Sequence, residues 1–246
     1  MSAFLLCNKY MIKDKPVISN QYGALVMAFV PLIYAISLRG FYVIDLFFVL
    51  SWLFLYLFSY PFLSLFNKRI TARNKKWAII YAVISSIFAL PILFKQPTIL
   101  QFFIPMIPLV IIQIYYTKQK DERNLINDIS GYLIFGIVGM AGYYLITQQY
   151  NIAILIHPTL FFIATTFYVK SVARERRNPL YKKLNIGIHI LLMLSYLFFN
   201  YYLIAFAYLC GLIRSIILPT KNLNIKQVGM WEFLIITIFT VCLILS

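Results

Sequence analysis

Nine long apolar runs, separated by short polar segments, dominate the sequence. None of them alternates apolar with polar residues, as residues 46–58 and 191–199 illustrate, so the pattern of a membrane β-barrel is missing. About 20 apolar residues span a bilayer as an α-helix, which pairs its own backbone groups where no water is present. The runs therefore predict nine transmembrane helices, at residues 21–38, 41–62, 77–94, 98–116, 128–147, 151–169, 185–200, 201–218 and 228–245.

The seventh and eighth runs meet at Asn200 with almost no polar sequence between them. This boundary indicates either a very tight turn or one long hairpin.

Composition explains why these runs face lipid. The 246 residues are 62% hydrophobic and only 12% charged, with a mean hydropathy of +0.84. A soluble domain has roughly 45–50% apolar and about 25% charged residues, so this chain has too little charge to cover a soluble surface. The prediction is an all-α polytopic membrane protein.

The basic residues define the direction of the spans. Every lysine and arginine except Arg39 and Lys95 falls on the N-terminal side of the predicted layout. Positively charged loops stay in the cytoplasm, so we expect the N-terminus inside, the C-terminus outside and an odd number of spans in the cell membrane. The net charge of +15 does not indicate nucleic-acid binding, because the charges form short clusters and no continuous stripe.

The expected organisation is a cytoplasmic N-terminal segment, residues 1–20, followed by one transmembrane domain, residues 21–246. The first residues do not read as a cleaved signal peptide, because their apolar stretch is short and its lysines follow it. Met11 is an alternative start to Met1. Three cysteines and two histidines share no metal or redox spacing, so no cofactor or metal is predicted.

Two spans contain helix irregularities. Pro105 and Pro108 remove backbone donors from the fourth span, which predicts a kink or a broken turn. Gly136, Gly139 and Gly142 recur every three residues in the fifth span, and small residues let membrane helices approach closely. The alternative for these glycines is room for a ligand against bare backbone.

Two polar stretches follow the fourth and sixth spans, at residues 118–128 and 168–178. Both mix carboxylates or amides with cations, whereas topology alone requires only positive charge. They supply the candidate ligand-binding residues Arg123, Asn124, Asn127, Asp128, Tyr168, Lys170, Arg174, Glu175 and Arg176. The competing interpretation is that these cations only set topology and pair with anionic lipid headgroups of the bilayer.

Two acidic residues stand apart from these stretches. Asp45 and Glu232 lie near the ends of the second and ninth spans. Both are expected to extend to water.

Three segments resemble the YwiC-like family of bacterial integral membrane proteins. They are residues 16–24 (Pro-Val-Ile-Ser-Asn-Gln-Tyr-Gly-Ala), 122–131 (Glu-Arg-Asn-Leu-Ile-Asn-Asp-Ile-Ser-Gly) and 168–178 (Tyr-Val-Lys-Ser-Val-Ala-Arg-Glu-Arg-Arg-Asn). The family's first motif usually has His where this chain has Tyr22. The resemblance covers nearly the whole chain and implies a multi-pass membrane protein, but it implies no activity.

In architecture the chain is also similar, more distantly, to UbiA-type prenyltransferases, which have nine helices and a cytoplasmic N-terminus. That similarity implies a site over the loops after helices two and six, where Asp-rich motifs hold Mg²⁺ on a prenyl diphosphate. Tyr168 and Lys170 fit the residues that precede the second motif. However, residues 67–77 contain no carboxylate and residues 168–183 contain only Glu175, so the similarity implies a pocket without standard metal-dependent transfer.

Three functions therefore remain open. The first is a UbiA-like, cytoplasm-facing pocket for an anionic lipid or a prenyl diphosphate. The second is a small transporter, favoured by the interrupted fourth span and the glycine-rich fifth span, although no charge is expected at mid-depth. The third is a non-catalytic subunit or assembly factor with a membrane-protein partner. Polar stretches that converge on one cavity favour the first function.

The predicted layout is tested by fusing reporters to both ends of the chain and by labelling single cysteines at Lys75 and Arg176. We expect the N-terminus and both cysteines on the cytoplasmic side and the C-terminus outside, because nearly all cations then stay inside. Finding the two ends on one side contradicts the layout.

Overall fold

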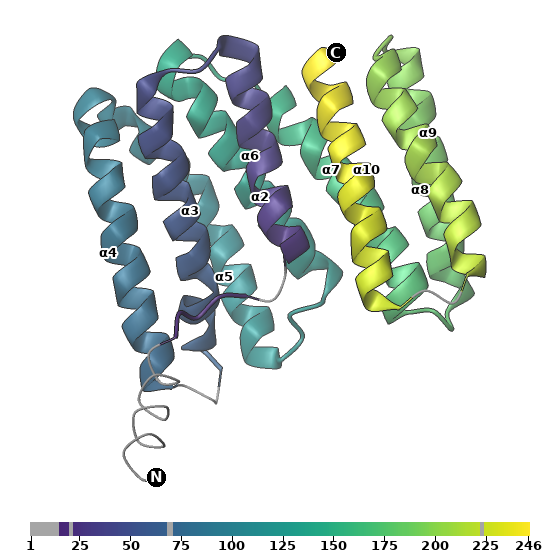
Figure 1. Ribbon diagram of the computed structural model, residues 1–246, viewed down its shortest axis with the longest axis horizontal. Coiled ribbons are helices and arrows are strands. Elements are labelled where there is room, and N and C mark those ends of the chain that lie inside the picture. Colours follow the sequence, from purple (N-terminus) through teal and green to yellow (C-terminus); the bar gives the residue numbers. More distant parts are fainter. Residues whose placement is uncertain (1–14, 20–21, 68–70, 222–223) are drawn as a thin grey trace, which may run out of the picture. The chain divides into compact units, whose positions relative to one another are not determined.

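The computed structural model describes residues 15–19, 22–67, 71–221 and 224–246 (Figure 1). These residues form nine α-helices and no strand, so the prediction of an all-α polytopic membrane protein is confirmed. The helices are α2 (Tyr22–Arg39), α3 (Val43–Ser64), α4 (Ala72–Lys95), α5 (Phe103–Gln119), α6 (Leu125–Thr147), α7 (Ala153–Val169), α8 (Pro179–Phe198), α9 (Tyr202–Ile217) and α10 (Ile225–Leu245). Of the expected N-terminal segment, residues 1–14 and 20 lie outside the described residues.

Six helical segments in the described part of the chain are long and apolar enough to cross a membrane. They are Val43–Ser64, Ala72–Lys95, Pro97–Gln119, Leu125–Thr147, Ala153–Arg174 and Gln227–Leu245. Two shorter apolar helices, Gly23–Arg39 and Tyr202–Ile217, accompany them. Helix α8 begins with a basic turn that contains Lys182 and Lys183, so its apolar part is shorter than the helix.

Asn200 forms the very tight turn between α8 and α9. Its φ of 64° is in the left-handed region, which Asn tolerates better than most residues. The Tyr201 N–H donates to the Tyr196 carbonyl at 2.9 Å, and the Asn200 N–H donates to Leu197 at 3.1 Å. The last carbonyls of α8 are thereby satisfied, and the expected split at this position is confirmed.

The described helices divide into two compact units. Of the described residues, the first contains 15–19, Tyr22 and Tyr42–Asn127, and the second contains Gly23–Phe41 and those of 128–246. The single transmembrane domain over residues 21–246 stays a prediction.

In the first unit, α3 packs closely against α4 and also contacts α5. Between α3 and α4, the Ser85 hydroxyl donates to the Ser51 carbonyl at 2.8 Å, and the Ser51 hydroxyl donates to Ser85 at 3.1 Å. Small hydroxyl residues of this kind join membrane helices, because lipid offers them no other partner.

The irregular turn expected in the fourth span is present, but it lies before the two prolines. A 3₁₀ segment, η1 (Pro97–Phe102), precedes α5, which continues through Pro108. Pro105 falls in the first turn of α5, where the backbone N–H has no helical partner anyway. The helix therefore accommodates Pro105 at little cost.

The second unit has an aromatic core. The Phe161 and Phe239 rings stack with their centroids 3.8 Å apart, which joins α7 to α10, and Tyr208 of α9 packs edge-on against Phe161. Figure 1 shows α7 and α10 next to each other with α8 and α9 beside them. This four-helix group positions the site described below.

The glycines of α6 serve close helix packing. A Cβ added to Gly139 would lie 2.6–2.8 Å from Pro31 of α2, including its backbone, and one added to Gly136 would lie 3.0 Å from the Leu155 Cα of α7. The Gly142 carbonyl accepts a hydrogen bond from Arg39 at 3.0 Å. Tight packing, rather than space for a ligand, thus explains Gly136 and Gly139.

Gly139→Ala should destabilise the protein by about 1–3 kcal/mol, since the added methyl group forces backbones apart. The control is Gly229→Ala in α10, where nothing lies within 4 Å of the added Cβ; we expect it to be neutral or slightly stabilising. Unfolding in mixed micelles of increasing SDS content measures both free energies. Equal stability of the two variants contradicts the packing of α6.

Candidate functional site

The end of α7 has unusual helix geometry. Lys170–Arg174 form a π-helical turn, η2, and the Glu175 N–H donates to the Lys170 carbonyl at 2.6 Å. Such turns insert an extra residue into a helix and often occur at functional sites. The predicted stretch 168–178 therefore leaves the span through a wider turn, which is followed at Pro179 by α8.

Arg174 connects this turn to the start of α6. Its Nη1 lies 3.3 Å from the Asp128 Oδ2, and both side chains are partly exposed. A partly exposed ion pair of this kind contributes at most about 1 kcal/mol to the stability of the folded protein. Its importance is geometric, because it joins the two polar stretches that the sequence singled out.

Three candidate residues belong to the first unit and have local partners there. The Asn124 Oδ1 accepts from the Ile126 N–H at 3.1 Å and thereby caps α6. The Asn127 side chain donates to the Glu122 carbonyl at 2.7 Å, and Arg123 is exposed. These contacts stabilise the turn between α5 and α6.

The remaining candidates separate into buried and exposed residues. Tyr168 and Lys170 are buried, with the Lys170 Nζ 5.8 Å from the centre of the Tyr181 ring. Glu175 and Arg176 are exposed. Arg176 lines the cavity described next.

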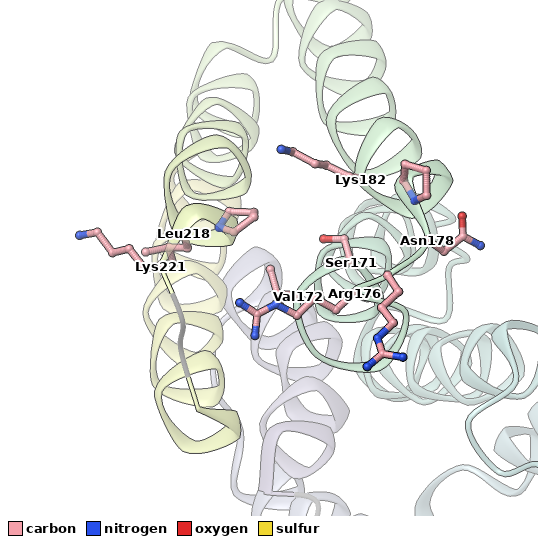
Figure 2. Close-up of a pocket in the computed structure, with 10 residues that line it drawn as sticks. Ser171, Val172, Arg176, Asn178, Lys182, Leu218 and Lys221 are labelled. Carbon is pink, nitrogen blue, oxygen red and sulfur yellow. The ribbon is translucent and has the colours of Figure 1, made fainter.

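That cavity has a volume of about 270 Å³ and lies at the basic end of the second unit (Figure 2). We use "basic end" for the α7–α8 junction together with the segment after α9. The cavity is lined by Ser171, Val172, Arg176, Arg177, Asn178, Pro179, Lys182, Leu218, Pro219 and Lys221. In Figure 2 the Ser171 hydroxyl and the Lys182 side chain extend toward the Leu218 side, while Lys221 and Asn178 point outward.

The lining of this cavity is strongly cationic. Arg176, Arg177, Lys182 and Lys221 contribute positive charge, and none of the described residues that line the cavity is acidic. Arg and Lys with nearby hydroxyl and amide groups are the side chains that bind phosphate oxygens in proteins. The arrangement can therefore attract and hold an anion.

Below the cavity, the structure buries a cluster that the sequence analysis did not select. Arg214 of α9 is 4% exposed and its Nη1 forms an ion pair with the Glu232 Oε1 of α10. The guanidinium also lies over the Tyr168 ring, 3.8 Å from its centre. An ionisable residue inside a span is by itself a sign of function. Glu232 lies within α10, so its presence in an apolar run was the sequence signal that could have revealed this cluster.

The expected exposure of both isolated acidic residues was wrong. Glu232 is 7% exposed because Arg214 pairs with it. Asp45 is 1% exposed, and its Oδ2 accepts from the Tyr42 N–H at 2.8 Å. Each carboxylate has a partner inside the protein, so neither needs to extend to water.

Comparison with known proteins agrees with the sequence motifs. The model of the family described as YwiC-like protein matches residues 18–143. A protein of Haemophilus influenzae, described as an uncharacterized protein, is 45% identical over 235 residues, which cover 94% of this chain and 99% of that protein. The chain belongs to the YwiC-like family.

A second relative extends the comparison within the YwiC-like family. The uncharacterized protein YwiC of Bacillus subtilis is 29% identical over 221 residues, 89% of this chain and 92% of that protein. No solved structure matches the chain, and the UbiA-like bundle stays a prediction. The cavity lies outside residues 18–143.

The buried ion pair generates a stability prediction. Arg214→Met leaves the Glu232 carboxylate buried and unpaired, which should cost about 3–5 kcal/mol. Adding Glu232→Leu removes that charge and should recover much of the loss, because apolar residues of similar volume replace a buried ion pair well. SDS-induced unfolding measures the natural protein, Arg214→Met, Glu232→Leu and the double variant, and additive losses of the two single variants in the double variant contradict the pair.

Proposed function

We propose that this protein binds the phosphate-bearing headgroup of an anionic lipid or a prenyl diphosphate in the cavity at its cytoplasmic, basic end. The observation that carries the proposal is the cavity lining of Arg176, Arg177, Lys182 and Lys221 without any acidic residue. Like charges brought together in a hollow repel one another, and an anion relieves that repulsion.

The size of the cavity supports a headgroup as the occupant. A volume of about 270 Å³ is at the lower end of small-molecule sites, so it accommodates a phosphate or diphosphate group and not a whole lipid. The apolar chain of the ligand lies outside the cavity.

Exposed apolar side chains on α8 and α9 provide a path for the apolar tail of the ligand. On α8, Leu184 is 42% exposed and Leu191, two turns further along the same face, is 65% exposed. Ile213 and Ile217 on α9 are likewise exposed. An amphiphile with its phosphate on Lys182 can extend its tail along these helices into the bilayer.

The proposal is one of binding, and no reaction is assigned. The Ser171 hydroxyl donates to the Tyr168 carbonyl at 2.7 Å, so its proton is already engaged by the backbone. The Asn178 amide is one of the side chains that distinguish the stretch 168–178 from a purely topological signal, and it lines the cavity together with the cation Arg176. A role confined to assembly does not require such a hollow.

Lys182→Gln is the sharpest test, because the neighbouring Lys183 is exposed, equally basic and absent from the lining. Lys182→Gln should weaken binding of farnesyl diphosphate and of phosphatidylglycerol about tenfold, since it removes a charge-assisted hydrogen bond of roughly 1.5 kcal/mol. Lys183→Gln should leave both affinities unchanged.

Titration calorimetry in a zwitterionic detergent measures the prenyl diphosphate, and native mass spectrometry measures the lipid. Phosphatidylcholine is the neutral-headgroup control, and its retention should not respond to either variant. If Lys182→Gln and Lys183→Gln bind both anionic probes as the natural protein does, the cavity is not the site.

A further inference from the structure

The buried Arg214 has hydrogen-bonding capacity that the protein does not use. Its Nη1 is engaged by Glu232, but its Nε and Nη2 have no partner, and neither has the Glu232 Oε2 or the Tyr168 hydroxyl. Buried polar atoms are costly unless water or a ligand satisfies them. Four such atoms around one guanidinium therefore indicate an occupant.

The unused atoms of Arg214 lie on one edge of the guanidinium. Nε–H and one N–H of Nη2 point in parallel and form the side-on fork that binds two oxygens of a phosphate or carboxylate. Glu232 holds the opposite nitrogen, and the Tyr168 ring covers one face of the group. The guanidinium is thus fixed in position, and both donors of its fork are buried without a hydrogen-bond partner.

Helix α8 adds further polar atoms to this cluster. The Ser215 hydroxyl donates to the Asn185 Oδ1 at 3.1 Å, while the Asn185 Nδ2 has no partner. His189 lies within electrostatic range of Arg214. Its Nδ1 must donate to the Asn185 carbonyl, 2.8 Å away, which leaves Nε2 as an acceptor without a partner.

The cluster lies one helical turn below the cavity on three helices. Leu218 follows Arg214 by four residues, Val172 follows Tyr168 by four, and Lys182 precedes Asn185 by three. One turn corresponds to about 5 Å. Tyr168 packs in one cluster with Val172 and Leu218 of the cavity lining, so the two levels are in direct contact.

We infer that the cavity has an inner subsite, in which the Nε–Nη2 fork of Arg214 binds a phosphoryl oxyanion and water fills the remaining space. The inference rests on the proposed function and deepens it. The outer cations attract the anion, and the inner donors hold its terminal oxygens. The ligand class is a phosphoryl group, whether it is a lipid headgroup or free diphosphate.

Cysteine accessibility tests the inner subsite without relying on affinity. In a variant with Cys7→Ser, Cys210→Ala and Cys242→Ala, Ser215→Cys should react with a small anionic methanethiosulfonate applied to inverted membrane vesicles. Ala207→Cys, on the same helix in the aromatic core, should not react; Ser215 and Ala207 are both 0% exposed, so reaction at position 215 alone requires access through the inner subsite. Lys221→Cys, which is exposed, should react fastest.

Protection of Ser215→Cys from modification by an added ligand identifies the occupant of the inner subsite. Farnesyl diphosphate should slow modification of Ser215→Cys at least tenfold. Protection by inorganic diphosphate as well supports a free phosphoryl anion, whereas protection by farnesyl diphosphate alone supports a lipid headgroup. A Ser215→Cys variant that is as unreactive as Ala207→Cys overturns the inner subsite.

A conservative substitution separates this inference from the proposed function. Arg214→Lys keeps the positive charge beside Glu232 but removes the fork, so affinity for farnesyl diphosphate should fall about tenfold with unchanged folding by size-exclusion chromatography. If Lys182→Gln weakens binding and Arg214→Lys does not, the inner subsite is wrong and the cavity stands. If neither weakens binding, the proposed function fails as well.

Discussion

A polar group in hydrocarbon must find its partner within the protein, and this constraint organises the whole chain. It makes the backbone helical, and it explains why Ser51 and Ser85 bond across α3 and α4. It also explains why the Tyr42 N–H pairs with Asp45 at the start of α3. Single buried atoms such as the Tyr208 hydroxyl also lack a partner, but four such atoms gather around Arg214, and so costly a concentration is a sign of a ligand or of water.

The helices could be predicted from the sequence because a segment that crosses the bilayer must be both helical and apolar, and apolar segments are visible in the hydropathy pattern. All nine expected spans correspond to helices, but α4 begins at Ala72 and α8 at Pro179, five and six residues earlier than expected. Both starts are charged turns that hydropathy does not count as membrane. They are helical because Thr71 and Asn178 cap them through the N–H groups of Asn74 and Leu180.

The site was harder to predict than the fold, for a physical reason. Of the stretch 168–178, Arg176 lines the cavity and Arg174 meets Asp128, and a ligand-binding role for these residues stays a prediction. Arg214 and Glu232 are 18 residues apart on different helices, so only tertiary packing reveals their pairing. Sequence hydropathy treats Glu232 as an isolated charge near a span end, and such a charge ordinarily extends to water.

Topology and ligand binding require the same residue types at this end of the molecule, so neither composition nor charge alone can separate the two roles. Position does separate them. Lys182 and Lys183 contribute equally to the positive-inside signal, yet only Lys182 borders the hollow. Arg214 adds little to the positive-inside signal, because it is 4% exposed and its charge is paired with a carboxylate. Burying the Arg214 guanidinium costs desolvation energy, so its positive charge alone does not explain its place in the protein. Its Nε and Nη2 have no hydrogen-bond partner within the protein, and together they have the geometry that binds two oxygens of an anion.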